Sequence, residues 1–83
     1  MDALDGNAIG GLLHEVFGTE MTDAAGRCAN CGTTGPVAEA VVYLDAPGTV
    51  VRCRNCSNIL MVFARVHGRT CVDLRGLATL EAR

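Results

Sequence analysis

The sequence predicts one small, mainly β domain of antiparallel strands with a single N-terminal helix. The chain has 83 residues, and a core of that size rarely supplies more than about 3–5 kcal/mol of stability. Four of its five cysteines form two Cys-x-x-Cys pairs, Cys28 with Cys31 and Cys53 with Cys56. Two such pairs complete a tetrahedral set of four thiolates. We therefore expect a metal-stabilised fold in which residues 1–83 form one domain.

The first expected element is an amphipathic helix over residues 5–18. Apolar side chains recur at the three- and four-residue spacing of one helix face: Ile9, Leu12, Leu13, Val16 and Phe17. Asp5 or Asn7 can cap its start, and Gly18 suits a left-handed end. Gly10 and Gly11 each cost a helix about 1 kcal/mol relative to Ala, so we expect another segment to pack very close to them. A shorter helix that begins at Ile9 is the alternative.

The strands and both cysteine pairs are expected within residues 19–76. Residues 19–27 are polar and predict a loop or short strand that leads into the first pair. Four strands are expected after it: 37–44, 49–53, 59–66 and 70–74. Pro47 and Gly48 predict a turn at 45–48, and residues 67–69 predict a tight connection. Gly76 ends the last strand, which leaves residues 77–83 as a helical turn or a frayed tail.

The residue after each cysteine pair is expected to turn through positive φ. Gly32 does this without strain, whereas Ser57 is a less comfortable residue at the matching position. Backbone N–H groups in such turns usually point at the thiolates and partly neutralise them.

The four paired cysteines predict one structural Zn²⁺ bound by Cys28, Cys31, Cys53 and Cys56. An all-sulfur ligand set leaves no open position for water, so we expect no metal-assisted hydrolysis and no enzyme activity. Iron in the same geometry, serving electron transfer, is an alternative. It is disfavoured because the chain has 4% aromatic residues and no tryptophan to shield a redox centre. A redox dithiol is disfavoured because two such pairs occur without a βαβ pattern.

Three further residues could carry chemistry but are expected not to. Cys71 is expected to be a small buried hydrophobe, with a reactive thiol or a fifth ligand as the alternative. His14 lies at the edge of the helix stripe and His67 beside a turn glycine, so both are expected at the surface or its boundary.

The charges are unevenly distributed along the chain. Residues 1–45 hold one arginine against seven acidic residues, a balance of −6. Residues 46–83 hold six arginines against two acidic residues, a balance of +4, and there is no lysine anywhere. The arginine-rich second half could contact nucleic-acid phosphates. We favour an ordinary solvated face paired with acidic residues, because the net charge is −2 and aromatic residues for base stacking are scarce.

The segment 59–66 is apolar on both faces. Ile59, Met61 and Phe63 would face one side, and Leu60, Val62, Ala64 and Val66 the other. This pattern predicts a central strand covered on both sides. The helix can cover one face, and we expect a protein partner or a second copy of the chain on the other. The alternative is that loops and the C-terminal tail fold over it.

We expect no targeting or membrane segment. The start is acidic and lacks the basic and apolar regions of a signal peptide. The apolar run 59–64 is far shorter than the roughly 20 residues that cross a bilayer. A soluble, cytoplasmic protein is expected.

The cysteine pairs and the strands between them resemble a zinc ribbon of the rubredoxin-like kind over residues 28–74. The opening 4–8, the Phe17-Gly18 exit and the closing 68–76 extend this to a resemblance with a small, uncharacterised bacterial zinc-ribbon family. The resemblance implies zinc on the four paired cysteines and no established activity. The chain departs from the usual zinc-ribbon pattern in its second cysteine pair, which lacks the Pro and Gly common there. The function expected from all of this is a non-catalytic module for protein contacts, with a nucleic-acid accessory protein as the alternative.

Overall fold

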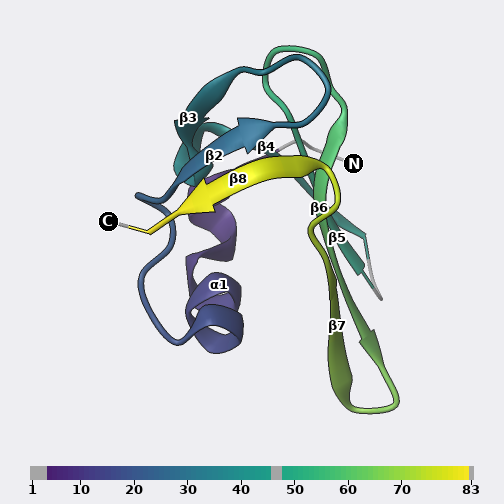
Figure 1. The fold of residues 1–83 in the computed structure, drawn as a ribbon. Helices are drawn as coiled ribbons and strands as arrows, with labels where there is room; N and C mark the ends of the chain where they lie inside the picture. The colour runs from purple at the N-terminus through teal and green to yellow at the C-terminus, as the bar shows by residue number, and fades with distance from the viewer. Residues whose placement is uncertain (1–3, 46–47, 83) are drawn as a thin grey trace.

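The computed structural model describes residues 4–45 and 48–82 (Figure 1). Its elements are β1 (Leu4–Asp5), η1 (Gly6–Ile9), α1 (Gly10–Phe17), β2 (Ala25–Cys28), β3 (Thr34–Pro36), η2 (Val37–Glu39), β4 (Val41–Asp45), β5 (Gly48–Arg52), β6 (Ile59–Val66), β7 (Arg69–Asp73) and β8 (Leu77–Glu81). The expected class, mainly β with one short helix near the N-terminus, is confirmed.

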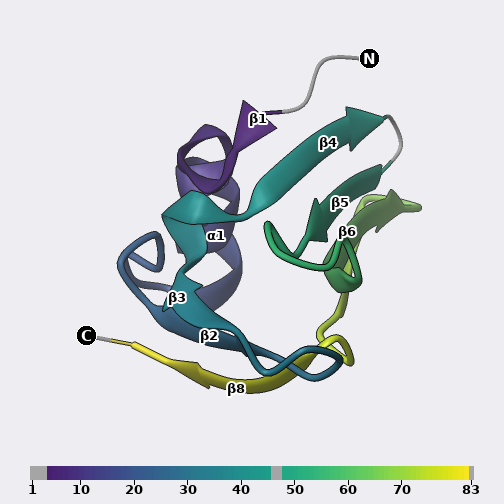
Figure 2. The ribbon, with the colours of Figure 1, turned by 90° about the horizontal axis from the view of Figure 1, so that it is seen from above.

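The strands form two antiparallel sheets. The larger sheet has the order β1-β4-β5-β6-β7, and the smaller has the order β3-β2-β8. Helix α1 lies against the inner face of the larger sheet, and the smaller sheet crosses over the same interior (Figure 2). The buried apolar side chains come from η1, α1, the segment before β2, η2 with the residue after it, and the larger sheet: Ile9, Leu13, Met21, Ala24, Val37, Ala40, Val42, Val51, Met61 and Phe63.

The N-terminal helix is shorter than residues 5–18. The 3₁₀ turn η1 precedes the helix, and in it the Asn7 N–H donates to the Asp5 carboxylate at 3.0 Å. Helix α1 ends at Phe17, and Gly18 caps it with φ of 75°. The expected close packing at Gly10 and Gly11 is wrong. A Cβ on Gly11 would meet nothing within 4 Å, and one on Gly10 would only touch Thr22 at 3.6 Å.

The close approach occurs at Gly6 instead. A Cβ on Gly6 would lie 1.9 Å from the carbonyl oxygen of Val37, so only glycine fits where η1 passes η2. The expected strand 37–44 is shorter than predicted. Val37–Glu39 form the 3₁₀ turn η2, and β4 begins only at Val41.

Strands β4 to β7 lie close to their expected positions, whereas the short strand β3 at Thr34–Pro36 was not predicted. Strand β6 spans Ile59–Val66 as predicted, and β7 starts one residue earlier than predicted, at Arg69. Strands β4 and β5 pair from Val41 opposite Arg52 to Asp45 opposite Gly48. The predicted turn at 45–48 falls largely on residues 46 and 47, which lie outside the described residues.

The C-terminal residues form a strand rather than a helical turn or a frayed tail. Strand β8 pairs with β2, from Ala25 opposite Glu81 to Cys28 opposite Leu77. Leu77 and Leu80 pack against the buried core. This burial orders the segment, and the pairing makes β2 the central strand of the smaller sheet.

Strand β6 is central, but its two faces differ from the predicted alternation. Met61 and Phe63 are 1% and 2% exposed and face the core. The register shifts between Val51 and Arg52, opposite the start of β6, and this irregularity leaves Ile59 40% exposed while Leu60 packs against the core.

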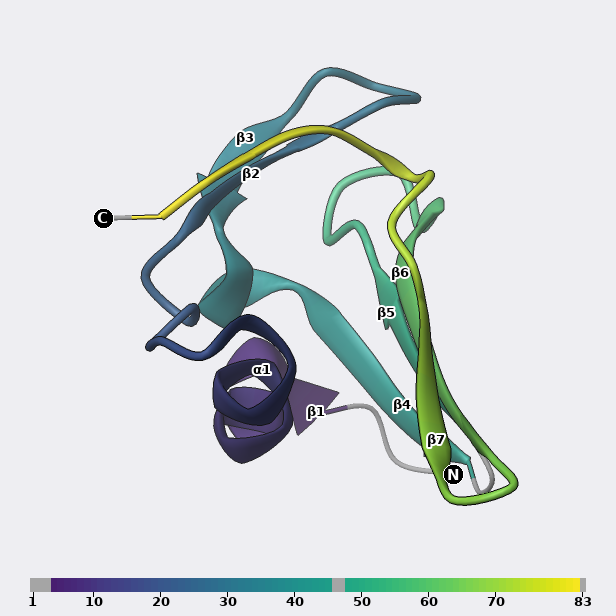
Figure 3. The same cartoon turned by 60° about the horizontal axis from the view of Figure 1, so that its bottom comes forward.

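The opposite side of the larger sheet carries a group of uncharged side chains next to a charged edge. Alternation along β4 to β7 places six uncharged residues there, which we call the outer face: Tyr43, Val50, Val62, Ala64, Val66 and Cys71. On the same side, Asp73 and Arg69 of the edge strand β7 lie opposite Val62 and Val66. In the described part of the chain, α1 and the smaller sheet both lie on the other side of the larger sheet (Figure 3). The alternative that the C-terminal tail covers this face is wrong, because that segment joins the smaller sheet.

No helix within residues 4–45 and 48–82 is long and apolar enough to cross a membrane.

Candidate metal centre

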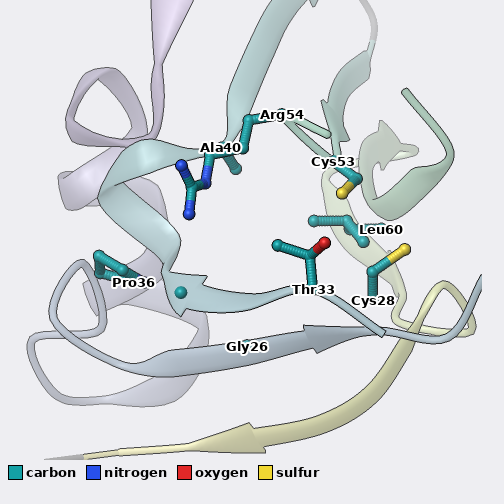
Figure 4. A pocket seen from close by; sticks show the side chains of 9 residues that line it. Gly26, Cys28, Thr33, Pro36, Ala40, Cys53, Arg54 and Leu60 are labelled. Atoms are coloured by element: carbon teal, nitrogen blue, oxygen red, sulfur yellow. The ribbon is translucent and has the colours of Figure 1, made fainter. Parts of the chain in front are cut away.

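The two cysteine pairs lie at the ends of strands that belong to different sheets. Cys28 is the last residue of β2, and Cys31 lies in the loop that follows. Cys53 directly follows β5, and Cys56 lies in the loop before β6. Figure 4 shows Cys28 and Cys53 on facing segments of the chain, on either side of Leu60. The cluster therefore lies where the smaller sheet meets the larger one.

Both pairs use the same backbone turn. The Gly32 N–H donates to the Cys28 carbonyl at 3.0 Å, and the Ser57 N–H donates to the Cys53 carbonyl at 2.9 Å. The N–H groups of these two cysteines also donate to carbonyls at the ends of their own loops, at 2.9 and 2.8 Å. Gly32 and Ser57 have φ of 79° and 65°, which confirms the predicted left-handed turn at both positions. The turns present both sulfurs of each pair to one point.

The sulfur positions fit a tetrahedral metal ion. All four Sγ atoms lie within 4.8 Å of one another. The Cys28–Cys56 and Cys31–Cys53 sulfurs are each 3.7 Å apart, and all four cysteines are free thiols. Zn–S bonds of about 2.3 Å in a tetrahedron place neighbouring sulfurs about 3.8 Å apart. The predicted ligand set is thus brought together in one cluster that could hold a metal ion.

The four sulfurs differ in exposure and in proton affinity. Cys28 and Cys53 are buried, Cys56 is half-buried and Cys31 is exposed. The hydrogen bond that joins the Cys31 sulfur to the Thr33 hydroxyl, and then the one from the Asn55 side-chain amide, lower the pKa of Cys31 to about 5. A hydrogen bond from the Asn30 amide lowers the pKa of Cys56, whereas burial raises the pKa of Cys53. The thiols of Cys31 and Cys56 therefore ionise more readily than that of Cys53.

Contacts around the cluster connect the two loops to other elements. The Arg54 guanidinium lies 3.3 Å from the Glu39 carboxylate in η2. The Ala29 N–H donates to the Gly76 carbonyl at 2.9 Å. The hollow between Cys28, Cys53 and Leu60 has a volume of about 30 Å³, which is too small for an organic substrate (Figure 4).

The other candidate residues lie away from the cluster. Cys71 is exposed on β7 opposite Ala64, so its predicted burial is wrong. His14 and His67 are both exposed, as predicted.

Several arginines are paired with acidic side chains. Arg54 pairs with Glu39, and Arg65 lies 3.4 Å from Glu15. Arg75 lies 2.7 Å from Asp73, and its hydrogen bonds lower the pKa of this carboxyl to about 2. Three arginines of the second half therefore have acidic partners.

Comparisons with known proteins identify a family without assigning an activity. The family model described as "Family of unknown function (DUF6510)" matches residues 1–83. No curated protein and no solved structure matches the chain. The four-cysteine cluster is therefore the feature that indicates what chemistry the chain can support.

Proposed function

The chain belongs to the DUF6510 family of unknown function, and we propose that it is a non-catalytic zinc-ribbon module in which one structural Zn²⁺ joins the two sheets. The observation that carries this proposal is the origin of the ligands. Two sulfurs come from the loop after β2 and two from the loop after β5, at tetrahedral spacing. An ion bound there links the smaller sheet directly to the larger one.

The ligand chemistry supports zinc in a structural role. Thiolates select Zn²⁺ or iron among the common metals, and Zn²⁺ has no redox chemistry. When bound, the ion supplies fixed tetrahedral geometry and positive charge. Four protein sulfurs fill its coordination sphere, so no position is left for a water or a substrate.

A role in protein contacts is the second part of the proposal. The outer face of the larger sheet presents Val50, Val62 and Tyr43 in one cross-strand row. Val66, further along the same face, is 45% exposed. The row ends at Asp73 of the edge strand β7. Apolar side chains beside a charged rim are typical of protein interaction sites. We propose that a protein partner or a second copy binds this face.

Metal analysis tests the first part. Protein purified without chelators should contain one zinc per chain and be colourless, and Cys31→Ser should lose the metal. Metal removal should abolish the β-sheet circular dichroism, because structural zinc contributes on the order of 10 kcal/mol to folding. If the purified protein is red and contains iron, the bound metal is iron and not zinc. An unchanged spectrum after complete metal removal would refute the structural role.

Variants of the outer face test the second part. Sedimentation equilibrium up to high micromolar concentration should show self-association that Val62→Asp abolishes. Thr79→Asp, at an exposed position of β8, is the control and should change nothing. If the wild type is monomeric, a pull-down should capture a protein that Val62→Asp no longer captures. Absence of both effects would refute the proposed contact role.

A further inference from the structure

The two cysteine pairs have an asparagine at the same position. In both pairs asparagine directly precedes the second cysteine, as Asn30 before Cys31 and Asn55 before Cys56. Each asparagine reaches across to the other pair. The Asn30 amide nitrogen lies 3.5 Å from the Cys56 sulfur, and the Asn55 amide nitrogen lies 3.5 Å from the Cys31 sulfur. The contacts are reciprocal, so each loop holds the outermost sulfur of the other loop.

The receiving sulfurs are the ones that water can reach. Cys31 is exposed and Cys56 is half-buried, whereas the first cysteine of each pair is buried. Four thiolates around one Zn²⁺ leave two negative charges on the cluster, and N–H donors to the sulfurs reduce that charge. Donors on the buried side come from the backbone, as in the 3.4 Å contact from the Asn55 N–H to the Cys53 sulfur. On the solvent side the backbone groups of Thr33 and Asn58 are joined by the side-chain amides of Asn30 and Asn55.

We propose that Asn30 and Asn55 are positioning residues that hold the two outer thiolates in place and slow the loss of the metal. This inference rests on the proposed metal-binding function. An amide in each loop donates to a ligand from the other loop, so opening either loop breaks two contacts together. The asparagines thereby couple the two cysteine pairs at the surface where a chelator or a proton would attack.

Asn30 gives the cleaner test, because the Cys31 sulfur also has the Thr33 hydroxyl at 3.2 Å. In the metal-loaded protein, Asn30→Ala should release zinc to excess chelator about tenfold faster than the wild type, the size typical of lost contacts to metal ligands. Asn30→Asp has nearly the same shape but places a carboxylate beside the thiolate. It should release zinc faster still. Asn58→Ala is the matched control, because the Asn58 side-chain amide contacts the Ile59 carbonyl, and the substitution keeps the backbone N–H of residue 58 that lies at Cys56.

Cobalt substitution supplies a second measurement. The sulfur-to-cobalt charge-transfer bands should shift in Asn30→Asp and stay unchanged in Asn58→Ala, with equal circular dichroism in all loaded variants. If Asn30→Asp retains metal as well as the wild type, the donor role is wrong and asparagine serves only the turn. If the wild type itself binds no metal, the proposed function fails instead, so the two failures are distinguishable.

Discussion

Ser57 occupies a backbone conformation that suits glycine. Its φ is 65°, and Gly32 has φ of 79° at the equivalent position of the first pair. A Cβ in the left-handed region costs roughly 1–2 kcal/mol, and the greater freedom of glycine in the unfolded chain offsets part of the gain. Ser57→Gly should therefore raise the free energy of unfolding of the metal-loaded protein by about 0.5–1 kcal/mol in urea titrations. Gly32→Ser should lower it, and a loss of stability in Ser57→Gly would contradict the turn geometry.

Two glycines differ sharply in the space available for a side chain. A Cβ on Gly76 would lie 1.8 Å from the Ile59 carbonyl oxygen, a backbone atom, whereas one on Gly11 would meet nothing within 4 Å. Gly76→Ala should lower the free energy of unfolding by at least about 2 kcal/mol, because the chain crossing must open. Gly11→Ala should raise it by up to about 1 kcal/mol through helix propensity. Equal effects of the two substitutions in denaturant titrations would count against a close crossing of the chain at Gly76.

At the residue scale the four candidate metal-binding cysteines could be predicted from the sequence, but the side chains that contact their sulfurs could not. Cys-x-x-Cys spacing is local, so the four sulfurs follow from the sequence. The contacts of Asn30 and Asn55 join residues 26 and 24 positions apart, and only the fold brings them together. The repeated Cys-x-Asn-Cys pattern was the available signal. Cys71 was misplaced because strand alternation gives its side of β7 and does not say whether that side is covered.

At the scale of elements, β8 depends on burial rather than on propensity. Its partner β2 lies about fifty residues earlier, and the short segment has no distinctive pattern, so the sequence predicted a tail. Leu77 and Leu80 are half-buried against the core. Leu77→Ala and Leu80→Ala should each lower the free energy of unfolding by about 1–2 kcal/mol. Ala78→Ser, at an exposed position between them, should change it by less than about 0.5 kcal/mol in the same thermal or urea titrations. Equal stability of all three variants would mean that β8 is not packed.

Whether the other elements were predicted correctly depends on how clearly their ends are marked in the sequence. Strand β6 was placed correctly because a run of apolar residues is bounded by Asn58 and by His67-Gly68. The helix was predicted too long because η1 continues the apolar spacing with a 3₁₀ turn. The first strand of the larger hairpin was predicted too long because Val37 is buried from a turn rather than from a strand. Periodicity identifies burial, and it does not distinguish these backbone forms.

For the whole molecule, the sequence predicted antiparallel strands hung from one metal site but not their division into two sheets. That division requires β2 to pair with β8 while β5 pairs with β6. The cysteine pairs end up on different sheets, so an ion bound by all four would connect distant parts of the chain. Loss of the ion should therefore affect the whole fold and not only the loops.

Acid provides a graded test of that connection. Metal binding requires thiolates, so protons compete with the ion. The folded-state pKa of Cys31 is lowered to about 5 from 9.0, so its stabilising contribution is present above its unfolded pKa and is lost as the pH falls through about 5. Asp73, with a pKa of about 2, stays ionised through that range, and its ion pair with Arg75 remains intact.

Because protons compete with the ion for the thiolates, zinc content and circular dichroism should fall together as the pH is lowered from neutral. Both are measured on one sample series, with released zinc followed by a chromophoric chelator. Cys71→Ser should leave both midpoints unchanged, because Cys71 lies outside the cluster. Cys31→Ser should already be zinc-free at pH 7. If zinc were released at a higher pH than the pH at which the β-sheet signal falls, the two sheets would stay together without the ion. The hydrophobic core, and not the metal, would then stabilise the fold.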